Sequence, residues 1–372
     1  MIGVIADDTT GANDIGVMLA KHGYLTQIAT WQDGGAAIDP KADAVVIDTD
    51  SRLDPPALAY QKVFAATQSL RALGCTPLHK KTCSVFRGNI GVEFDAMLDA
   101  AGGTFAIVSL AFPKNGRQTF HGVHTLNGAR LENSAFANDP VHPARESDLT
   151  RILSTQTKRR VGSIELATVR AGVDELRAAL HAASASFDYC IVDAVEQGDL
   201  TRLAEAAHDF PFFAGSSALA EELPRLWPKR NARNPLAGKD FSSNRVVLVV
   251  AGSLTPQTKN QTEVLIAAGV ATITLDSRLV FSAVSRAQEI SRVTAAAIGH
   301  LSTGRDTLVR ADQQEDTVAA TKSLGAQHGL DGLSISKAVS AALADVTAAI
   351  VDATSLKRLI VAGGDTSGTI CR

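Results

Sequence analysis

The chain has 372 residues, 45% hydrophobic and 20% charged, which is enough for two domains that each have a core. Its 36 basic and 39 acidic residues give a formal net charge of -3, and aromatic residues make up only 5%, which argues against nucleic-acid binding. The first residues do not read as a signal peptide and no apolar run approaches the roughly 18 residues of a membrane span, so we predict a soluble cytoplasmic protein with no membrane partner.

A strand is predicted at residues 2–6, and a polar turn and a helix at 15–22 follow it. With the next strand, at 26–30, this makes a β-α-β unit, which is typical of a parallel sheet. The turn carries Asp7 and Asp8 and lacks the glycines of a dinucleotide fingerprint. Paired carboxylates in such a turn suit a general base, a hydroxyl acceptor or a magnesium partner. The alternative is that one of them caps the helix.

Residues 44–52 form another strand of the buried type, and this strand ends in polar groups. Arg52 at its end is a candidate for a bidentate clamp on a substrate carboxylate, because a planar guanidinium matches a carboxylate. The alternative is a surface ion pair with Asp50 or Asp54. A helix is predicted at 57–73.

The densest polar cluster lies at residues 79–91, directly before a predicted amphipathic helix at 92–101. It contains cations, hydroxyl groups and two glycines. Such groups at the entrance of a helix suit an anionic, polyhydroxylated ligand, although a solvated basic loop would have a similar composition. The candidate ligand-binding residues are Lys81, Thr82, Cys83, Ser84, Arg87 and Asn89.

The rest of the amino-terminal half alternates predicted strands, loops and helices. A strand at 105–111 leads into residues 117–148, which we predict to be rich in loops because they contain several Asn, Pro and His residues. These histidines and the four cysteines lack the spacing of a metal site, so no protein metal site is predicted. Further elements are expected at 148–157 (helix), 188–193 (strand), 200–208 (helix) and 218–226 (helix).

The composition changes at residues 227–244, which are basic, contain proline and lack apolar periodicity. We place a linker there, between a domain at 1–226 and a second domain at 245–372. Within the second domain, strands are expected at 246–250 and 271–275, and helices at 259–268, 282–302 and 334–352. The predicted fold is α/β, with two domains that each have a largely parallel sheet flanked by helices and an active site in the cleft between them.

Two stretches of the second domain each predict an aliphatic strand that runs into a glycine-rich turn. One is the strand at 246–250; the other, 359–362, is a short apolar run typical of a buried parallel strand. Glycines let the backbone approach a ligand, and a following helix would point N–H groups at an anion, so the two turns predict a shared phosphate cradle. The alternative is a plain strand-to-helix turn with an Asp or Thr cap. The candidate residues are Ser253, Gly363, Gly364, Asp365, Thr366 and Ser367.

Six short motifs follow one another along nearly the whole chain: IADDTTGANDIG, DTDSR, KKTCSVFRGNIG, FPKNGR, VVAGSLTPQT and VAGGDTSG. In this combination and order the chain resembles the four-carbon acid sugar kinase family, which are ATP-dependent kinases of threonate, erythronate and 3-oxotetronate. The resemblance implies that the first domain holds the sugar acid and the second holds ATP. It places Asp7 or Asp8, Arg52, Lys81 to Ser84 and Arg87 at the substrate, and Ser253 with Gly363 to Ser367 at the nucleotide.

The chain departs from the family pattern at two points. Threonate-type members resemble K-K-x-D-S-T-x-R-G-N at the third motif, whereas this chain has Cys83 in place of the Asp and Val85 in place of the Thr. This difference affects which sugar acid is the substrate. The chain also ends at Arg372, four residues after Gly368, whereas family members continue through a further strand and another glycine-rich segment. Either the nucleotide-binding domain is incomplete at its carboxyl end, or its nucleotide site is open there.

We predict phosphoryl transfer from ATP, with Mg²⁺ as a second cofactor, to a hydroxyl group of a four-carbon sugar acid, expected to be the terminal one. Asp7 or Asp8 would accept the hydroxyl proton or orient the hydroxyl through magnesium, and a homodimer is expected. Two other classes stay open. One is a sugar-acid binding or sensor protein, which would not bind a nucleotide; the other is a thiol enzyme with Cys83 as nucleophile beside Lys81 and Arg87.

Overall fold

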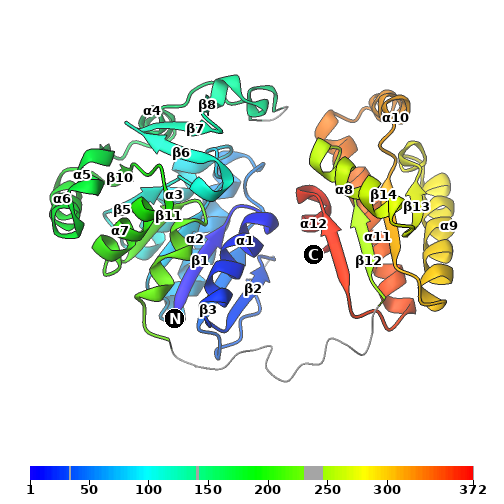
Figure 1. The fold of residues 1–372 in the computed structure, drawn as a ribbon, viewed down its shortest axis with the longest axis horizontal. Coiled ribbons are helices and arrows are strands. Elements are labelled where there is room, and N and C mark those ends of the chain that lie inside the picture. The colour runs from blue at the N-terminus through cyan, green and yellow to red at the C-terminus, as the bar shows by residue number, and fades with distance from the viewer. Residues whose placement is uncertain (33–34, 140–141, 230–245, 372) are drawn as a thin grey trace. The chain divides into compact units, whose positions relative to one another are not determined.

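The computed structural model describes residues 1–32, 35–139, 142–229 and 246–371. It divides into two compact units, Met1–Ala237 and Gly238–Arg372, and each unit has sheets and helices of its own (Figure 1). The predicted linker at 227–244 lies outside the described residues from position 230 onward.

The first unit is built on an eight-stranded sheet with the strand order β2-β3-β1-β4-β11-β5-β10-β9. All of its paired strands run parallel. Its inner strands are buried and mostly apolar, as expected for a parallel sheet that helices cover on both faces, except that β4 carries buried His79, Lys80 and Lys81. The strands are β1 (Ile2–Ala6), β2 (Thr26–Thr30), β3 (Ala44–Asp48), β4 (Leu78–Lys81), β5 (Ala106–Ser109), β9 (Val161–Ile164), β10 (Tyr189–Val192) and β11 (Phe212–Gly215).

Helices form a layer on each face of this sheet. On one face, Val63 of α2 and Phe94 of α3 are buried against the strands. On the other face, Ile15 of α1, Leu180 of α6 and Leu203 of α7 form a second apolar core. The helices of the unit are α1 (Thr9–Lys21), α2 (Pro56–Ala72), α3 (Ile90–Ala101), α4 (Leu149–Ser154), α5 (Leu166–Ala171), α6 (Val173–Ser186) and α7 (Gln197–Ala207).

The chain changes its direction across the sheet between β1 and β4, which are hydrogen-bonded neighbours with Ala6 opposite Lys81. From β1 the chain passes through α1 to β2 on one side, whereas from β4 it passes through α3 to β5 on the other side. In open parallel sheets, ligands bind at the carboxyl ends of the strands where such a change occurs. The turns that follow β1 and β4 are therefore the expected walls of a ligand site.

Two predictions for this unit are corrected. The segment 117–148 is not only loop, because its first part forms a three-stranded antiparallel sheet, and Asn127-Gly128 with positive φ makes one of its tight turns. The predicted helix at 218–226 is replaced by short 3-10 turns, since Pro224 has no N–H to continue an α-helix. The small sheet consists of β6 (Arg117–Phe120), β7 (Val123–Leu126) and β8 (Ala129–Arg130).

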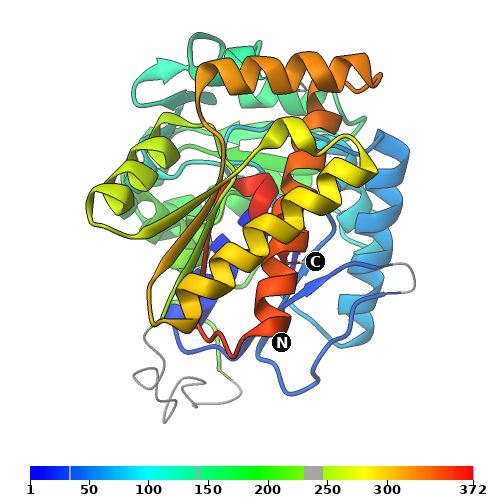
Figure 2. The ribbon, with the colours of Figure 1, turned by 90° about the vertical axis from the view of Figure 1, so that its right-hand side faces the viewer.

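The second unit has a four-stranded parallel sheet with the order β13-β14-β12-β15. Helices α9 and α11 lie side by side over one face (Figure 2), and α8 packs on the other. The sequence patterns predicted neither β14 nor α10. The strands are β12 (Leu248–Ala251), β13 (Ala271–Leu275), β14 (Thr307–Ala311) and β15 (Leu359–Ala362); the helices are α8 (Pro256–Ala267), α9 (Ala283–Ser302), α10 (Glu315–Gln327), α11 (Gly332–Ala353) and α12 (Gly364–Ile370).

The prediction that residues 359–362 form a buried strand is wrong. Among the described residues β15 pairs only with β12, so it lies at the edge of the sheet, where Leu359 and Ile360 are 39% and 55% exposed. An apolar run shows that a segment is a strand, but it carries no information on how many neighbours that strand has.

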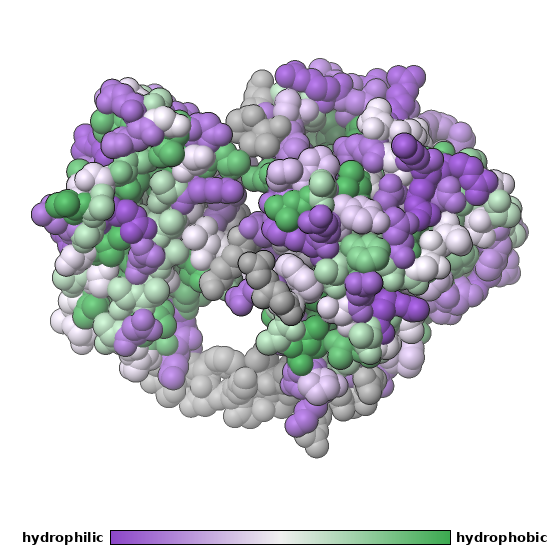
Figure 3. All heavy atoms as spheres, turned by 180° about the vertical axis from the view of Figure 1, so that it is seen from behind, coloured by the Kyte–Doolittle hydropathy of each residue, from purple (hydrophilic) through white to green (hydrophobic). Residues whose placement is uncertain are grey.

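Helix α11 is long and apolar enough to cross a membrane by length and composition, and it is the one such helix among the described residues. Leu343, Val346 and Ile350 of this helix are buried in the apolar core of the second unit. Packing on the sheet therefore accounts for its apolar face. On the side of the molecule drawn in Figure 3, hydrophobic residues are scattered among hydrophilic ones.

Candidate functional site

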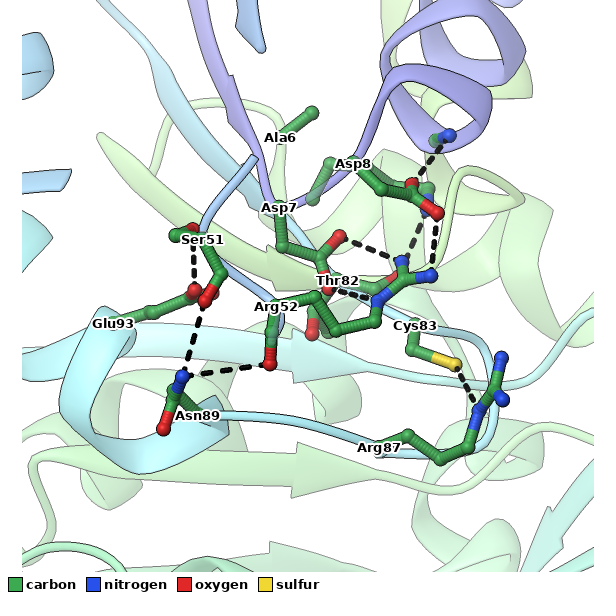
Figure 4. A network of polar contacts seen from close by, with 12 residues as sticks. Ala6, Asp7, Asp8, Ser51, Arg52, Thr82, Cys83, Arg87, Asn89 and Glu93 are labelled. Carbon is green, nitrogen blue, oxygen red and sulfur yellow. Dashed lines mark hydrogen bonds and ion pairs between the residues drawn. The ribbon is translucent and has the colours of Figure 1, made fainter. Parts of the chain in front are cut away.

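The turns after β1 and β3 meet at the guanidinium group of Arg52 (Figure 4). Asp7 is 1% exposed and accepts two hydrogen bonds from Arg52, from Nε to Oδ2 at 2.7 Å and from Nη2 to Oδ1 at 2.9 Å. Nη1 of Arg52 donates to Asp8. These partners replace the surface ion pair considered for Arg52, and Asp54 pairs with Lys62 at 2.7 Å instead. Arg52 thus holds both aspartates.

The two aspartates differ in charge environment and in access. Burial raises the pKa of Asp7, but Arg52 and Lys80 outweigh burial, and the pKa is lowered to about 2. Such a carboxylate is ionised at neutral pH and is a weak base. The side chain of Asp8 is 24% exposed, and it caps α1 by accepting from the N–H of Gly11 at 2.7 Å. Only Asp8 of this pair is accessible to a ligand.

A buried ion pair that the sequence analysis missed supports this turn. Nζ of Lys80 lies 2.8 Å from Oε2 of Glu93, and the two side chains are 0% and 1% exposed. Oγ of Ser51 donates to Oε1 of Glu93 at 2.5 Å. Asn89 adds hydrogen bonds from Nδ2 to the carbonyl oxygens of Ser51 at 3.0 Å and of Asp54 at 2.9 Å. The turn that carries Arg52 is therefore fixed to β4 and α3.

The sequence contained a signal for Glu93. It lies on the same face of α3 as Ile90, Phe94 and Met97, which are among the buried residues of this helix. An acidic residue on the apolar face of a helix needs a buried partner. Burial raises the pKa of Glu93 despite the lowering effect of Lys80.

Lys81 ends β4, and its ammonium group is buried beside the start of α1. Its Nζ donates to the carbonyl oxygen of Thr82 at 2.8 Å. A Cβ atom on Gly11 would lie 2.7 Å from this Nζ, so glycine at that position makes room for the lysine. Among the described residues, no carboxylate lies within 4.0 Å of Nζ, so Lys81 has charge available for an anion.

Cys83 and Arg87 interact in the next loop. Nε of Arg87 donates to Sγ of Cys83 at 3.4 Å, Nη1 donates to Asp139, and the guanidinium lies 4.8 Å from the ring centre of Phe136. Burial raises the pKa of the Cys83 thiol, but Arg52 and Arg87 outweigh burial and lower it. The thiol is only 6% exposed and packs in an apolar cluster, which does not favour a role as nucleophile.

The backbone of this loop fits closely against Arg52. Gly88 has φ of 101°, and a Cβ atom there would lie 2.9 Å from Cγ and 3.0 Å from the carbonyl oxygen of Arg52. Only glycine combines this conformation with this contact. The side chain of Thr82 is fully buried and its Oγ1 has no hydrogen-bond partner in the described parts of the chain, while the carbonyl oxygen of Ser84 interacts with Nε2 of His124 at 3.0 Å.

A cavity of about 700 Å³ adjoins the same loop. Of the predicted site residues, it touches Arg87 alone. Its other walls come from Val85, Phe86 and Gly88, from residues 142–146, and from residues 151, 152 and 154–156. The cavity therefore adjoins the predicted substrate residues without containing the aspartates.

The two glycine-rich turns of the second unit lie next to each other, because β12 and β15 are neighbours. Gly363 has φ of 120°, and a Cβ atom there would lie 3.0 Å from Cβ and 3.1 Å from the backbone nitrogen of Ser253. A Cβ atom on Gly252 would lie 2.1 Å from Oγ1 of Thr366. Thr366 is buried, whereas Gly364 and Asp365 are exposed. Side chains at the two glycines would collide with the neighbouring turn, so glycine at both positions allows the two turns to pack closely.

The comparisons with known proteins match two domain models to successive parts of the chain. A model described as a sugar-binding N-terminal domain matches residues 2–223, and one described as a nucleotide-binding C-terminal domain matches residues 248–372. The chain is 34% identical to a D-threonate kinase of Salmonella typhimurium over 371 residues, which are 97% of this chain and 84% of that protein. It is 32% identical to a 3-oxo-tetronate kinase of Pseudomonas savastanoi pv. phaseolicola over 382 residues, 100% of this chain and 85% of that protein.

A solved structure is similar over the same length. It is a Salmonella typhimurium protein described as a tRNA synthase, with a TM-score of 0.81 and 29% identity. The likeness covers 99% of this chain and 87% of that one.

Proposed function

Because the chain belongs to the four-carbon acid sugar kinase family, we propose that it transfers a phosphoryl group from ATP to a hydroxyl group of a four-carbon sugar acid such as threonate, erythronate or 3-oxotetronate. The observation that carries the proposal is the pair of sites. A site rich in cations lies at the strand ends of the first unit, and two adjacent glycine-rich turns lie at the strand ends of the second. A sensor of sugar acids would need only the first.

Asp8 acts on the hydroxyl group of the substrate in this proposal. One of its oxygens accepts from Gly11 and the other from Arg52, and a carboxylate has about four lone-pair positions, so acceptor capacity remains for a ligand hydroxyl. Lys81 places an unpaired positive charge near the same helix start and balances the charge of the group that is transferred. Arg52 and Asp7 position Asp8.

ATP supplies the phosphoryl group, and Ser253, Gly363, Gly364, Asp365 and Ser367 are the residues that we assign to its phosphates. No group of three His, Cys, Asp or Glu residues that could hold a metal occurs among the described residues. Mg²⁺ commonly binds through one or two carboxylates together with substrate phosphates. Each unit offers one accessible carboxylate for this, Asp8 at 24% exposure in the first unit and exposed Asp365 in the second.

The description of one similar structure as a tRNA synthase does not change the proposal. Binding of RNA requires many Lys and Arg contacts to phosphates. This chain has a formal net charge of -3 and 5% aromatic residues. We therefore propose a soluble cytoplasmic kinase of small acids. Its four cysteines are all free thiols in the described structure, as is usual in a reducing compartment. The homodimer stays a prediction, which a measurement of the molar mass by light scattering would test.

The test is a screen of ADP release with D- and L-threonate, D- and L-erythronate and 3-oxotetronate, with ³¹P NMR of the product. We expect one or more acids to be phosphorylated by the wild type and Asp8→Asn to reduce kcat by about 100-fold or more. Calorimetry that detects acid binding but no ATP binding would favour the sensor and overturn the kinase.

A further inference from the structure

Three guanidinium groups of the first unit interact electrostatically with Cys83, and two of them are hydrogen-bonded to carboxylates of the protein. Arg52 uses Nε, Nη1 and Nη2 on Asp7 and Asp8. Arg87 binds Asp139 and Sγ of Cys83 and lies over an aromatic ring. The third group belongs to Arg117, which interacts electrostatically with Cys83 and Arg87. The two arginines that the sequence analysis assigned to the substrate are thus largely engaged within the protein.

Arg117 stands at a fixed place in the backbone. It begins β6 and exchanges two hydrogen bonds with Phe112, from its N–H at 3.1 Å and to its carbonyl oxygen at 2.9 Å. Phe112 is buried and follows β5 closely, so Arg117 is anchored near the carboxyl end of that strand. This is the edge of the sheet at which the turns after β1, β3 and β4 also lie.

The side chain of Arg117 is only partly satisfied. Nη1 donates to the carbonyl oxygen of Asn115 at 3.1 Å. Nε is buried and has no hydrogen-bond partner within the described structure. No carboxylate of the described residues lies within 4.0 Å of the guanidinium. A buried donor without an acceptor costs free energy, and a bound acceptor would remove that cost.

The surroundings of Arg117 favour an anion. Burial lowers the pKa of Arg117 and the neighbouring positive charge of Arg87 lowers it further, while Cys83 and Asp14 act in the opposite direction. Asp14 is engaged by the hydroxyl group of Ser217. An anion placed here would therefore relieve the repulsion between Arg87 and Arg117.

We propose that Arg117 binds the carboxylate of the sugar acid, an inference that rests on the proposed function and deepens it. A planar guanidinium with a free Nε donor can bind a carboxylate through two parallel hydrogen bonds. Lys81 is the other cation of the site without a carboxylate partner, and it lies beside Asp8 at the start of α1. The two unpaired cations match the two anionic groups of the reaction, the substrate carboxylate at Arg117 and the transferred phosphoryl group at Lys81.

The test compares the acid with its neutral amide as substrates of wild type, Arg117→Gln and Arg117→Lys. Arg117→Gln is expected to raise KM for the acid on the order of 100-fold, since a hydrogen bond to a charged group is lost, and to leave the amide almost unchanged. Arg117→Lys keeps the positive charge but lacks the planar pair of donors, so its KM for the acid should lie between the values of the wild type and Arg117→Gln. Calorimetry with the acid alone gives the same order of affinities without turnover. The matched control is Arg130→Gln, an exposed arginine of the same small sheet that pairs with Glu132.

The outcomes separate the two proposals. Turnover by the wild type with unchanged KM for the acid in Arg117→Gln overturns the role of Arg117 and leaves the kinase. Acid binding that needs Arg117, without any phosphorylated product, overturns the kinase and leaves the carboxylate site. If Arg117→Gln does not fold, as judged by circular dichroism, the KM of Arg117→Lys decides: a value within twofold of the wild type rejects the proposal.

Discussion

Arg52 and Asp7 form a bidentate ion pair across 45 residues of sequence, with N–O distances of 2.7 and 2.9 Å. The pair joins the turns after β1 and β3, and it leaves Nη1 of Arg52 for Asp8. All three donor groups of the fork are therefore used inside the protein. This geometry gives Arg52 a positioning role toward Asp8, whereas the sequence pattern alone suggested a substrate clamp.

Arg52→Lys separates these two roles. A single ammonium group cannot replace the planar fork, so Asp8 loses its fixed orientation, and we expect kcat to fall about 10- to 100-fold with a small change in KM. Steady-state kinetics over a range of acid concentrations measures both constants. A large rise in KM at constant kcat would instead assign the clamp to Arg52.

Asp7→Asn and Asp8→Asn should affect different properties. Asp7→Asn leaves Arg52 without its buried counter-charge, and we expect a loss of about 3–5 kcal/mol in the free energy of unfolding. Asp8→Asn keeps a good helix cap and should leave stability nearly unchanged while kcat falls. Urea unfolding and kcat of both variants test this. Equal stabilities of the two variants would contradict the assignment.

The buried pair of Lys80 and Glu93 is expected to position the turn at Ser51. Lys80→Met leaves an uncompensated buried carboxylate, and we expect it to lower the free energy of unfolding by about 3–5 kcal/mol. The double variant Lys80→Met/Glu93→Leu removes both charges and should recover most of that loss. Its kcat should stay low, because Ser51 has lost its acceptor. Full recovery of kcat would show that the pair serves stability alone.

His79 predicts acid sensitivity. Burial lowers its pKa from 6.5 to about 3, and Lys81 and Lys80 add to this effect. As pH falls below 6.5, the unfolded chain binds a proton that the folded protein excludes, so stability declines progressively down to pH 3. Between pH 7 and pH 5 the titration of this histidine should lower the free energy of unfolding by about 2 kcal/mol. Urea unfolding of wild type and His79→Leu at both pH values tests it. The variant should show a smaller decline, and identical declines would reject the assignment.

The sequence located the turns after β1 and β3 because their signals are local, and their assignment to the substrate stays a prediction. A run of apolar residues followed by Asp7 and Asp8, or by the polar end of residues 44–52, indicates a strand end, and parallel strands bring their carboxyl ends to one edge. The sequence did not predict contacts between residues that are far apart along the chain. The partner of Glu93 and the unpaired state of Arg117 depend on which strands become neighbours, and residue periodicity does not contain that information.

The same reason explains the misread strand of the second unit. Leu359 and Ile360 are as apolar as the residues of β12, yet β12 has neighbours on both sides and β15 has one. Edge and centre differ in hydrogen-bond partners, which are set by the order of strands. The turn that follows β15 was nevertheless recognisable, because Gly363-Gly364 directly after a strand is a local signal.

Gly363→Ala tests whether that turn holds ATP. The new Cβ atom would lie 3.0 Å from Cβ of Ser253, and φ of 120° is unfavourable for alanine, so the space between the two turns should narrow. We expect ATP affinity to fall about tenfold or more, while binding of the sugar acid to the first unit stays unchanged. Calorimetry with each ligand separately measures both affinities.

The control for this experiment is Gly304→Ala in the same unit. Gly304 also has a positive φ, of 78°, but no heavy atom lies within 4 Å of its added Cβ, so this variant carries backbone strain without filling the space beside Ser253. Both variants should lose stability, Gly363→Ala more because of its contact with Ser253, and only Gly363→Ala should lose ATP affinity. If both variants lose ATP affinity equally, the effect comes from strain in the unit as a whole. If neither does, the phosphates bind elsewhere, and the glycine turn after β15 serves the packing of α12.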